Sequence, residues 1–339
     1  MIKRILYTLL IMFPVVASAQ INTDRVMAIG RNALYFEDYV LSIQYFNQVI
    51  NAKPYLSDPY FYRGLAKINL DDFQGAESDC SEAIERNPFV VSAYQVRGLA
   101  RIQQNNFAGA IEDYTKALEF DPENIGVWHN MALCRIRQED YKGAKNDLDK
   151  LIAISPRYTK AYLMRGEVDL KQKDTLAAEK DFGKAIEIDR YDADTWASRA
   201  ILRLQQQRYK DAEADFDHAI RLSTRNSGVY INRALARYHQ NNLRGAMSDY
   251  DIALDIDPNN FIGHYNRGLL RAQVGDDNRA IQDFNFVIEM EPDNMMAIFN
   301  RGLLLDQTGD YKGAIKDYST VINEYPNFLL GYQYRAQAR

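Results

Sequence analysis

Arginine and aspartate recur in this sequence at a fixed distance from each other. Seven times an arginine precedes an aspartate by 16 residues, and successive pairs stand 34 residues apart, or twice that across one gap. The pairs are Arg63 with Asp79, Arg97 with Asp113, Arg165 with Asp181, Arg199 with Asp215, Arg233 with Asp249, Arg267 with Asp283, and Arg301 with Asp317. Guanidinium and carboxylate groups form bidentate ion pairs. A row of unpaired guanidinium groups would instead bind an anionic ligand.

The balance of charges favours ion pairs inside the protein. Each of these arginines has its matched acid, and in residues 23–56 the equivalent positions hold Ile29 and Tyr45, so both charges are missing together. Residues 125–158 break the rule, because Met131 stands opposite Asp147. The ligand-binding alternative stays open, because a second cation follows most of the arginine positions by four residues. These cations are Lys67, Arg101, Arg135, Arg203, Arg237 and Arg271.

Residues typical of catalysis are sparse. The histidines are His129, His218, His239 and His264, and the cysteines are Cys80 and Cys134. The sequence contains no HExxH, GxSxG, CxxC or phosphate-loop motif. We therefore expect a protein that is not an enzyme and that carries no metal ion and no cofactor. The two cysteines are expected to be small, buried core residues without a disulfide.

A period of 34 residues defines the elements that carry these charges. With Ser57 as position 1 of a copy, small or apolar residues fall at positions 4, 8, 17, 20, 24 and 27, on one face of each of two helices. Position 20 is alanine in eight successive copies, which lets the two helices approach closely. A proline such as Pro88 at position 32 ends the second helix. Helix pairs that repeat the same pattern along the chain predict an all-α solenoid.

This pattern closely resembles that of the tetratricopeptide repeat (TPR) family. The best-fitting copies are residues 57–90, 91–124, 125–158, 159–192, 193–226, 227–260, 261–294 and 295–328. Residues 23–56 form a degenerate first copy, so nine repeats from residue 23 make up an array over residues 20–328. The resemblance implies a right-handed superhelical solenoid of helix-turn-helix repeats. Residues 329–339 are expected to form a C-terminal helix, either a cap or the start of a truncated tenth repeat.

The resemblance also implies which residues line a binding groove. In TPR proteins the first helices line a concave groove, and positions 2, 5, 6, 9, 12 and 13 often contact a peptide. Carried over to this chain, positions 5, 6, 12 and 13 give Asn130, Asn232, Asn266, Asn300, His129, Ile231, Tyr265, Phe299, Tyr238 and His239. An amide both donates and accepts hydrogen bonds, so amides flanked by apolar side chains suit an extended peptide or a partner helix. The alternative is that they are solvated surface residues.

The first nineteen residues have a different composition. Lys3 and Arg4 precede an apolar run over residues 5–16, and Ala17-Ser18-Ala19 offers small residues for cleavage. This arrangement predicts a secretory signal peptide over residues 1–19. The apolar run is shorter than the roughly 20 residues of a membrane-spanning helix, so we expect no integral membrane segment after its removal. The expected location is the periplasm of a two-membrane bacterium, or else the secreted or outer-membrane-associated fraction.

The net charge of the chain limits the classes of partner that we expect. Removal of Lys3 and Arg4 with the signal peptide takes the net charge from −5 to −7, which argues against a general nucleic-acid binder. We interpret the chain as a non-enzymatic scaffold or adaptor of the cell envelope that binds a peptide or partner protein. Two alternatives remain. The array is the repeat domain of a longer protein whose activity lies beyond Arg339, or it is a glycan or cell-wall binding module.

Overall fold

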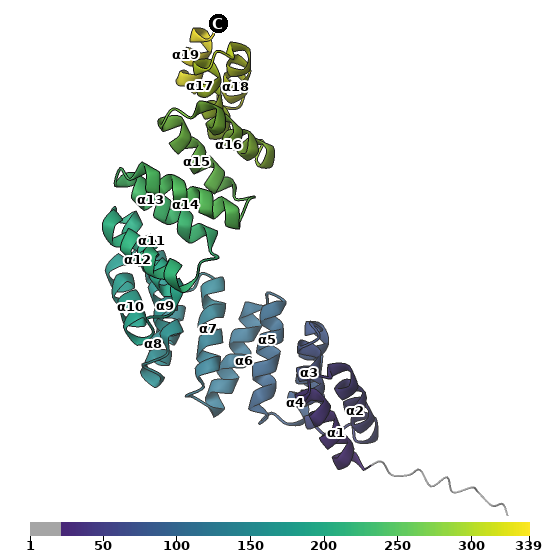
Figure 1. The fold of residues 1–339 in the computed structure, drawn as a ribbon. Coiled ribbons are helices and arrows are strands. Elements are labelled where there is room, and N and C mark those ends of the chain that lie inside the picture. The colour runs from purple at the N-terminus through teal and green to yellow at the C-terminus, as the bar shows by residue number, and fades with distance from the viewer. Residues whose placement is uncertain (1–21) are drawn as a thin grey trace, which may run out of the picture. The chain divides into compact units, whose positions relative to one another are not determined.

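The computed structural model describes residues 22–339, and the predicted signal peptide lies outside them. Within this range all regular elements are α-helices (Figure 1). They divide between two compact units, Met1–Pro156 and Arg157–Arg339. The first contains α1 (Thr23–Tyr35), α2 (Tyr39–Ala52), α3 (Asp58–Ile68), α4 (Phe73–Arg86), α5 (Val91–Gln103), α6 (Phe107–Phe120), α7 (Ile125–Arg137) and α8 (Tyr141–Ile154). The second contains α9 (Thr159–Lys171), α10 (Thr175–Ile188), α11 (Ala193–Gln205), α12 (Tyr209–Leu222), α13 (Ser227–His239), α14 (Leu243–Ile256), α15 (Phe261–Gln273), α16 (Asp277–Met290), α17 (Met295–Gln307), α18 (Tyr311–Glu324) and α19 (Leu329–Gln337).

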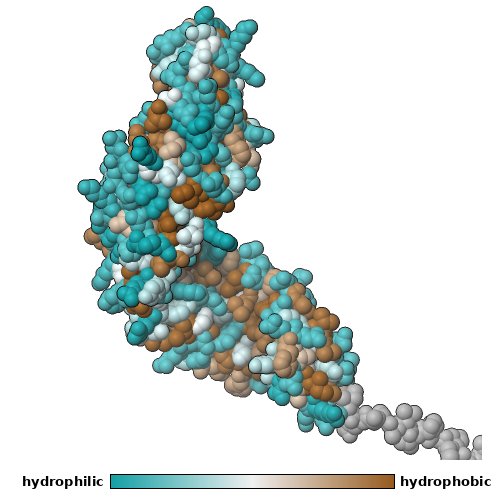
Figure 2. All heavy atoms as spheres, in the orientation of Figure 1, coloured by the Kyte–Doolittle hydropathy of each residue, from teal (hydrophilic) through white to brown (hydrophobic). Residues whose placement is uncertain are grey.

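Within each unit the helices pack in the order of the chain. The two helices of each 34-residue copy make the most extensive contacts, and each pair then packs on the next pair. This arrangement confirms the predicted all-α solenoid of stacked helix pairs. The outer surface visible in Figure 2 is mostly hydrophilic with scattered hydrophobic side chains, as expected when the apolar faces of the helices are turned toward each other.

The turn inside each pair has the same geometry throughout the array. The residue two before the second helix lies in the left-handed region, as at Glu139 (φ 60°) and Asn241 (φ 62°), and the last two copies place Gly275 and Gly309 there. The next residue caps the second helix in most copies. Asp140 Oδ1, for example, accepts a hydrogen bond of 2.9 Å from the Gly143 amide. Such a cap satisfies a backbone donor that has no partner inside the helix.

Small residues let the paired helices touch. The alanines at position 20 are completely buried from Ala76 to Ala314. A Cβ added to Gly166 would lie 2.5 Å from Phe182 Cε1, so no larger residue fits without movement of that ring. Cys80 and Cys134 are buried free thiols, as predicted. Burial raises the pKa of Cys80 to about 12, which keeps it protonated and unreactive at neutral pH.

Candidate binding surfaces

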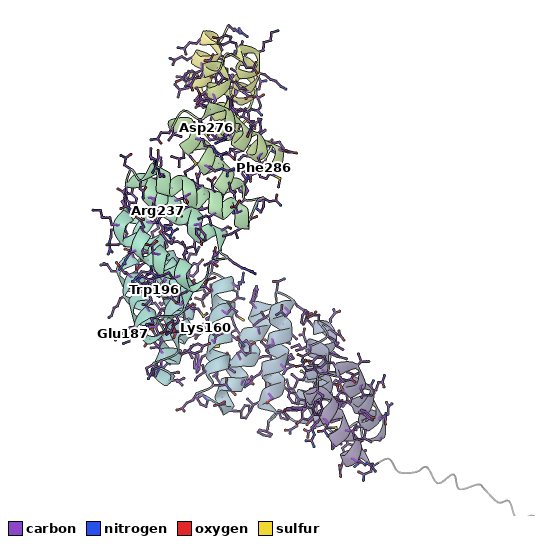
Figure 3. The ribbon with its side chains drawn as sticks, in the orientation of Figure 1. Lys160, Glu187, Trp196, Arg237, Asp276 and Phe286 are labelled. Atoms are coloured by element: carbon purple, nitrogen blue, oxygen red, sulfur yellow. The ribbon has the colours of Figure 1, made fainter. Side chains whose placement is uncertain are left out.

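The predicted pairs of arginine and aspartate are all present as ion pairs inside their own repeats. Asp249 is a clear case, with 1% of its side chain exposed. It accepts hydrogen bonds from Arg233 Nε at 2.9 Å and Nη2 at 2.6 Å, and from Arg237 Nη1 at 2.8 Å. Arg237 lies on α13 (Figure 3). Two guanidinium groups therefore neutralise one buried carboxylate.

The same arginines also join each repeat to the one before it. Arg233 Nη1 donates to Asp217 at 2.7 Å, and Arg267 Nη1 donates to Asp251 at 2.9 Å. Equivalent bonds link Arg63 to Asn47, Arg97 to Ser81, Arg301 to Asn285 and Arg335 to Ser319. The ion-pair pattern in the sequence did not predict this connection. The feature of the sequence that could have indicated it is a short polar residue at position 25, two residues after position 23.

The second set of cations is engaged by carboxylates as well. Arg203 donates to Asp215 of its own repeat and to Glu179 of the preceding one. Burial alone would raise the pKa of Glu179, but hydrogen bonds from Arg203 and Arg208 lower it below its usual range. Because these guanidinium groups already hold carboxylates, they do not form the unpaired ladder that an anionic ligand would need.

The fourth repeat is the exception that the sequence predicted. Met131 is buried where the other repeats carry arginine, and its Sδ lies 4.0 Å from Thr115 Oγ1 at position 25 of the preceding repeat. Asp147 therefore depends on Arg135, whose Nε lies 2.7 Å away. Burial raises the pKa of Asp147 to about 6, because the nearby Arg135 offsets only part of the desolvation.

The ten predicted groove residues divide between the two units. His129 and Asn130 lie half-buried on α7 in the first unit, and the other eight lie on α13, α15 and α17 in the second. Asn232, Asn266 and Tyr238 are half-buried. His239 is exposed, and its ring stacks on that of Tyr209 with centroids 4.6 Å apart.

Two of the predicted apolar groove residues belong to the packing between helices. Ile231 and Phe299 are each only 7% exposed. The Phe299 ring meets Phe328 edge-on at 5.0 Å and Tyr334 at 5.8 Å. This differs from the surface position expected from the family resemblance, because each side chain is covered by the following repeat. Their role in binding stays a prediction.

The amide of Asn300 has a partner within the array. Its Nδ2 donates to the hydroxyl of Tyr265, one repeat earlier, at 3.2 Å. Burial raises the pKa of Tyr265, and the bond from Asn300 offsets part of that rise. A ligand that used Asn300 as a donor would have to compete with Tyr265. Asn232 and Asn266 are thus the better placed of the three amides in consecutive repeats.

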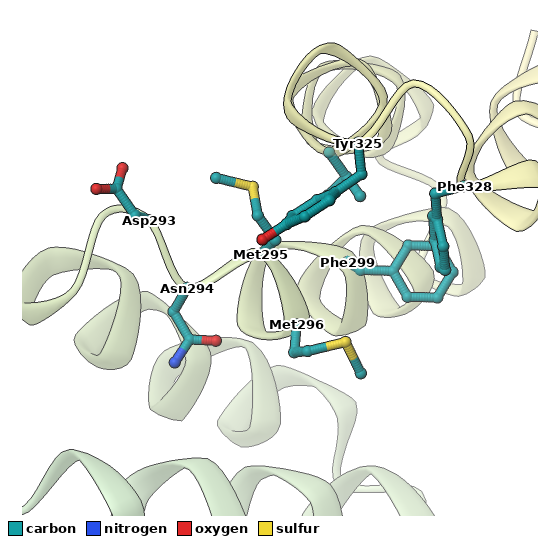
Figure 4. Close-up of a pocket in the computed structure, with 8 residues that line it drawn as sticks. Asp293, Asn294, Met295, Met296, Phe299, Tyr325 and Phe328 are labelled. Atoms are coloured by element: carbon teal, nitrogen blue, oxygen red, sulfur yellow. The ribbon is translucent and has the colours of Figure 1, made fainter.

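An apolar cavity of about 410 Å³ opens beside Phe299, where α17 begins and α18 ends (Figure 4). It is lined by Asp293, Asn294, Met295, Met296, Phe299, Val321, Tyr325 and Phe328. Figure 4 shows the rings of Phe299 and Phe328 against each other, and Met296 and Tyr325 are each more than half exposed. The cavity thus combines a wall of packed aromatic rings with methionine side chains, which adapt to the shape of an apolar group.

Two residues that line this cavity differ in type from their counterparts in the neighbouring repeats. Position 34 is asparagine in the preceding repeats of the second unit that end at Asn226, Asn260 and Asn294, and each of these caps the next helix. The ninth repeat has Phe328 there, and α19 has no side-chain cap. Position 31 is Tyr325, where the two preceding repeats carry acids. The repeat therefore exchanges a helix cap for an aromatic wall. This departure is visible in the sequence, although the predicted groove residues did not include it.

A row of exposed apolar residues continues from this cavity. Position 2 holds Ile262, Met296 and Leu330 in consecutive repeats, and each is about half exposed. Earlier copies carry charged or small residues there, namely Asp24, Asp58, Ser92, Gly126, Lys160, Asp194 and Gly228. Exposed apolar residues are ordinary when single. A row that repeats in register at one end of the second unit is a candidate contact surface.

Residues 22–339 contain neither a metal-binding cluster nor a membrane-spanning helix. No group of histidine, cysteine, aspartate and glutamate side chains there is arranged to hold a metal ion. Across the same residues, no helix has the length and apolar character needed to cross a membrane. Together, the stacked helix pairs and the paired charges define a helical-repeat protein whose candidate sites are contact surfaces.

Comparison with family models identifies the repeats. Models described as tetratricopeptide repeat match residues 198–261 and 265–327, and also residues 125–158 and 159–192. The last two ranges coincide with the fourth and fifth predicted repeats. A further model, described as TPR repeat, matches residues 98–134. The chain belongs to the tetratricopeptide repeat family. Proteins built from these repeats are generally non-catalytic scaffolds for protein interaction.

Solved structures share the fold. A tetratricopeptide repeat protein from Parabacteroides merdae aligns with a TM-score of 0.56 at 21% identity, over 74% of this chain and 98% of the other. The C-terminal part of a TPR repeat-containing protein from Cytophaga hutchinsonii gives 0.58 at 17% identity, over 70% and 97%. The pilF protein of Pseudomonas aeruginosa gives 0.54 at 19% identity, over 64% and 97%. No curated protein sequence matches the chain.

Proposed function

We propose that this chain is a non-enzymatic scaffold of the cell envelope that binds a segment of a partner protein along the first helices of its last repeats. The observation that carries the proposal is the apolar cavity beside Phe299, together with the exposed row of Ile262, Met296 and Leu330. A partner would insert one apolar side chain into the cavity and lay the rest of its segment along this row.

The chemistry of the cavity suits an anchor of this kind. Protein interfaces draw most of their binding energy from a few side chains buried in well-packed pockets. Phe299 is buried and meets Phe328 edge-on in the absence of a partner, so this wall of the pocket is already formed and little ordering entropy would be lost on binding. Met296 can adjust its conformation to close over the inserted group.

The half-buried amides of Asn232 and Asn266 supply the polar part of the proposed surface. Each can donate to a carbonyl and accept from an N–H of an extended segment. The charged side chains within the array add little to recognition, since the arginines at positions 7 and 11 are engaged in internal ion pairs. The proposed specificity is therefore apolar and amide-based, and binding should depend only weakly on salt.

Truncation of two exposed side chains that line the cavity tests this function. We expect the double variant Met296→Ala/Tyr325→Ala to bind its partner at least tenfold more weakly, because central anchors at interfaces contribute about 2 kcal/mol or more. The partner is first recovered from envelope extract with the wild-type chain, then purified. Its dissociation constant is measured for each variant by biolayer interferometry.

The matched control is Met290→Ala/Tyr191→Ala, which removes an exposed methionine and an exposed tyrosine of the same unit that do not line the cavity. Both double variants should keep a melting temperature near that of the wild type, because surface substitutions usually change stability by no more than about 0.5 kcal/mol. Equal affinity of the two double variants would show that the cavity is not the binding site.

Export is the second part of the proposal, and it rests on the sequence of residues 1–19. We expect the mature chain to begin at Gln20 and to be found in the periplasmic fraction of its source cell. N-terminal sequencing of the protein purified from fractionated cells checks this. Recovery of the chain with Met1 intact from the cytoplasm would contradict it.

A further inference from the structure

Arg199, on α11, lacks the bond that joins an arginine at position 7 to the residue at position 25 of the preceding repeat. Its Nε and Nη2 each donate to Asp215 at 2.8 Å, as in the other repeats. Position 25 of the fifth repeat, however, is Gly183 on α10, which has no side chain to accept a bond from Nη1. Within residues 22–339, Nη1 of Arg199 therefore has no hydrogen-bond partner.

The unpaired nitrogen faces open space at Gly183. A Cβ built on Gly183 would lie 3.9 Å from Arg199 Nη1 and would meet no other atom within 4 Å outside the backbone of its own helix. In the described residues, the fully buried polar side-chain atoms without a partner are the hydroxyls of Tyr114 and Tyr318. Because Arg199 Nη1 is not among them, it is open to solvent and can donate to a molecule that enters from outside.

The next junction of the second unit shows which group fits this space. There the carboxylate of Asp217, at position 25, accepts a hydrogen bond from Arg233 Nη1 at 2.7 Å and lies 3.9 Å from Arg237 Nη2. The junction after it repeats this arrangement around another aspartate. The corresponding arginines of the sixth repeat, Arg199 and Arg203, are present, and only the carboxylate is missing.

The charges around the two junctions favour a ligand with a single negative charge. At the junction of the sixth and seventh repeats, two guanidinium groups contact three carboxylates, those of Glu213, Asp217 and Asp249. At the junction of the fifth and sixth repeats, two guanidinium groups contact two, those of Glu179 and Asp215. One carboxylate would restore the balance and would offer two acceptor oxygens to the guanidinium groups. A phosphate dianion would exceed it.

We propose that Gly183, Arg199 and Arg203 form a binding site for a carboxylate group of a peptide ligand, which takes the place that Asp217 occupies one junction later. The ligand oxygens accept from Arg199 Nη1 and lie beside the guanidinium of Arg203. Glycine is essential to this site, because a Cβ at position 183 would stand where the ligand carboxylate has to enter. The site does not rest on the function proposed above, since it lies outside the last repeats.

A depression of about 470 Å³ adjoins the site and has room for the rest of the ligand. Gly183 lines it together with Tyr162, Lys180 and Lys184. The two lysines place positive charge beside the site, and Lys184 also pairs with Glu187 at 2.9 Å. The volume exceeds that of a single carboxylate group. The ligand is therefore a segment that carries its carboxylate on an acidic side chain or at a chain terminus.

Trp196, which also lies on α11 (Figure 3), reports directly on the site. The centre of its ring is 5.1 Å from the guanidinium carbon of Arg199. The other tryptophan of the chain is Trp128, in the first unit. In the full chain carrying Trp128→Phe, tryptophan emission therefore follows Trp196 alone.

The probe is the peptide acetyl-Ala-Ala-Glu-Ala-Ala-amide. It should change the emission of Trp196 saturably, with a dissociation constant on the order of 1 mM. The same peptide with glutamine in place of glutamate should bind about tenfold more weakly, as expected for loss of a charge-assisted hydrogen bond. An alanine peptide with a free C-terminal carboxylate distinguishes the two sources of the group. If it binds more tightly than the glutamate peptide, the ligand carboxylate is a chain terminus, and if more weakly, a side chain.

The variant Gly183→Asp tests the site from the side of the chain. Its carboxylate should fill the space and pair with Arg199, so the glutamate peptide should bind about tenfold more weakly or worse. This variant keeps the pair of Arg199 with Asp215, which a substitution of Arg199 would break. The control Gln205→Glu adds the same charge at an exposed position of α11. It should change the affinity by no more than about twofold, because salt screens exposed charges.

Three results would overturn the proposal. They are equal affinities of Gly183→Asp and Gln205→Glu for the glutamate peptide, equal binding of the glutamate and glutamine peptides, and tighter binding of inorganic phosphate than of the glutamate peptide.

The melting temperature provides an independent check that needs no ligand. Gly183→Asp and Gly183→Asn introduce side chains of nearly the same shape that differ in charge. The aspartate variant should melt higher by about 2 °C or more, because it gains a charge-assisted hydrogen bond from Arg199. Equal melting temperatures would show that the space at Gly183 does not favour a carboxylate, and the proposal would fail.

Discussion

Replacement of Asp249 by asparagine is expected to lower the free energy of unfolding of this protein by roughly 3–5 kcal/mol. Asp249 is almost completely buried and receives hydrogen bonds from both Arg233 and Arg237. Asparagine has nearly the same shape but no charge, so two partly buried guanidinium groups would lose their common counterion. Urea titration followed by circular dichroism, for wild type and variant, measures the loss.

The matched control lies two residues further along the same helix. Asp251 accepts one hydrogen bond from Arg267, and half of its side chain is exposed. Asp251→Asn should therefore cost about 1 kcal/mol or less. If the two substitutions cost the same, burial is not what makes the position-23 aspartates structural, and the account of the ion pairs would be wrong.

We expect the second large effect in the pH dependence of the free energy of unfolding, through the carboxyl group of Asp147. Its pKa in the folded state is raised from an ordinary 3.8 to about 6 by burial. Between these values the folded chain holds a proton that the unfolded chain has released. The free energy of unfolding contributed by this group therefore falls as pH rises from about 4 to 6. A shift of this size corresponds to about 2–3 kcal/mol.

The variant Met131→Arg should remove that loss. It restores the residue found at position 7 in the seven repeats that carry the ion pair, and it gives Asp147 a second cation beside Arg135. Its stability relative to Met131→Leu, which keeps the site apolar, should be greater at pH 7.5 than at pH 4.5. The difference in the free energy of unfolding between the two variants removes the contribution of every other carboxylate, because those groups titrate alike in both. A difference that does not change with pH would contradict the account of Asp147.

The sequence was sufficient to predict the helices and the charges inside them. A strict period assigns every residue a position on a helix, so the spacing favoured the pairing of Arg233 with Asp249 and placed Cys80 and Cys134 in the core, as the structure shows. The exception at Met131 could be predicted in the same way. Within one repeat, sequence position and spatial position are nearly equivalent.

Contacts between successive repeats were harder to predict. Whether Phe299 faces a groove or the next helix depends on the angle at which pairs stack, and the period does not contain that angle. The same limit explains the missed bond from Arg233 to Asp217. The division of the chain after Pro156 also had no signal in composition, because the residues on either side follow the ordinary repeat junction.

The cavity beside Phe299 was not predicted, although two of the residues that line it could have been noticed in the sequence. Phe328 and Tyr325 stand where neighbouring repeats carry polar residues. The aromatic residue at position 31 occurs in no earlier copy, whereas position 34 is also apolar or aromatic at Leu56, Val90 and Tyr158. A position-by-position comparison of the repeats with one another would have drawn attention to this surface.

The most direct test of the proposed function is photo-crosslinking in the living source cell. A benzoyl-phenylalanine residue at position 296, beside the cavity, should form a covalent adduct with one discrete protein of the cell envelope. The same group at position 290, an equally exposed methionine that does not line the cavity, should not. Adducts of the same pattern at both positions, or none at position 296, would contradict the account of this protein as a scaffold that binds its partner at the last repeats.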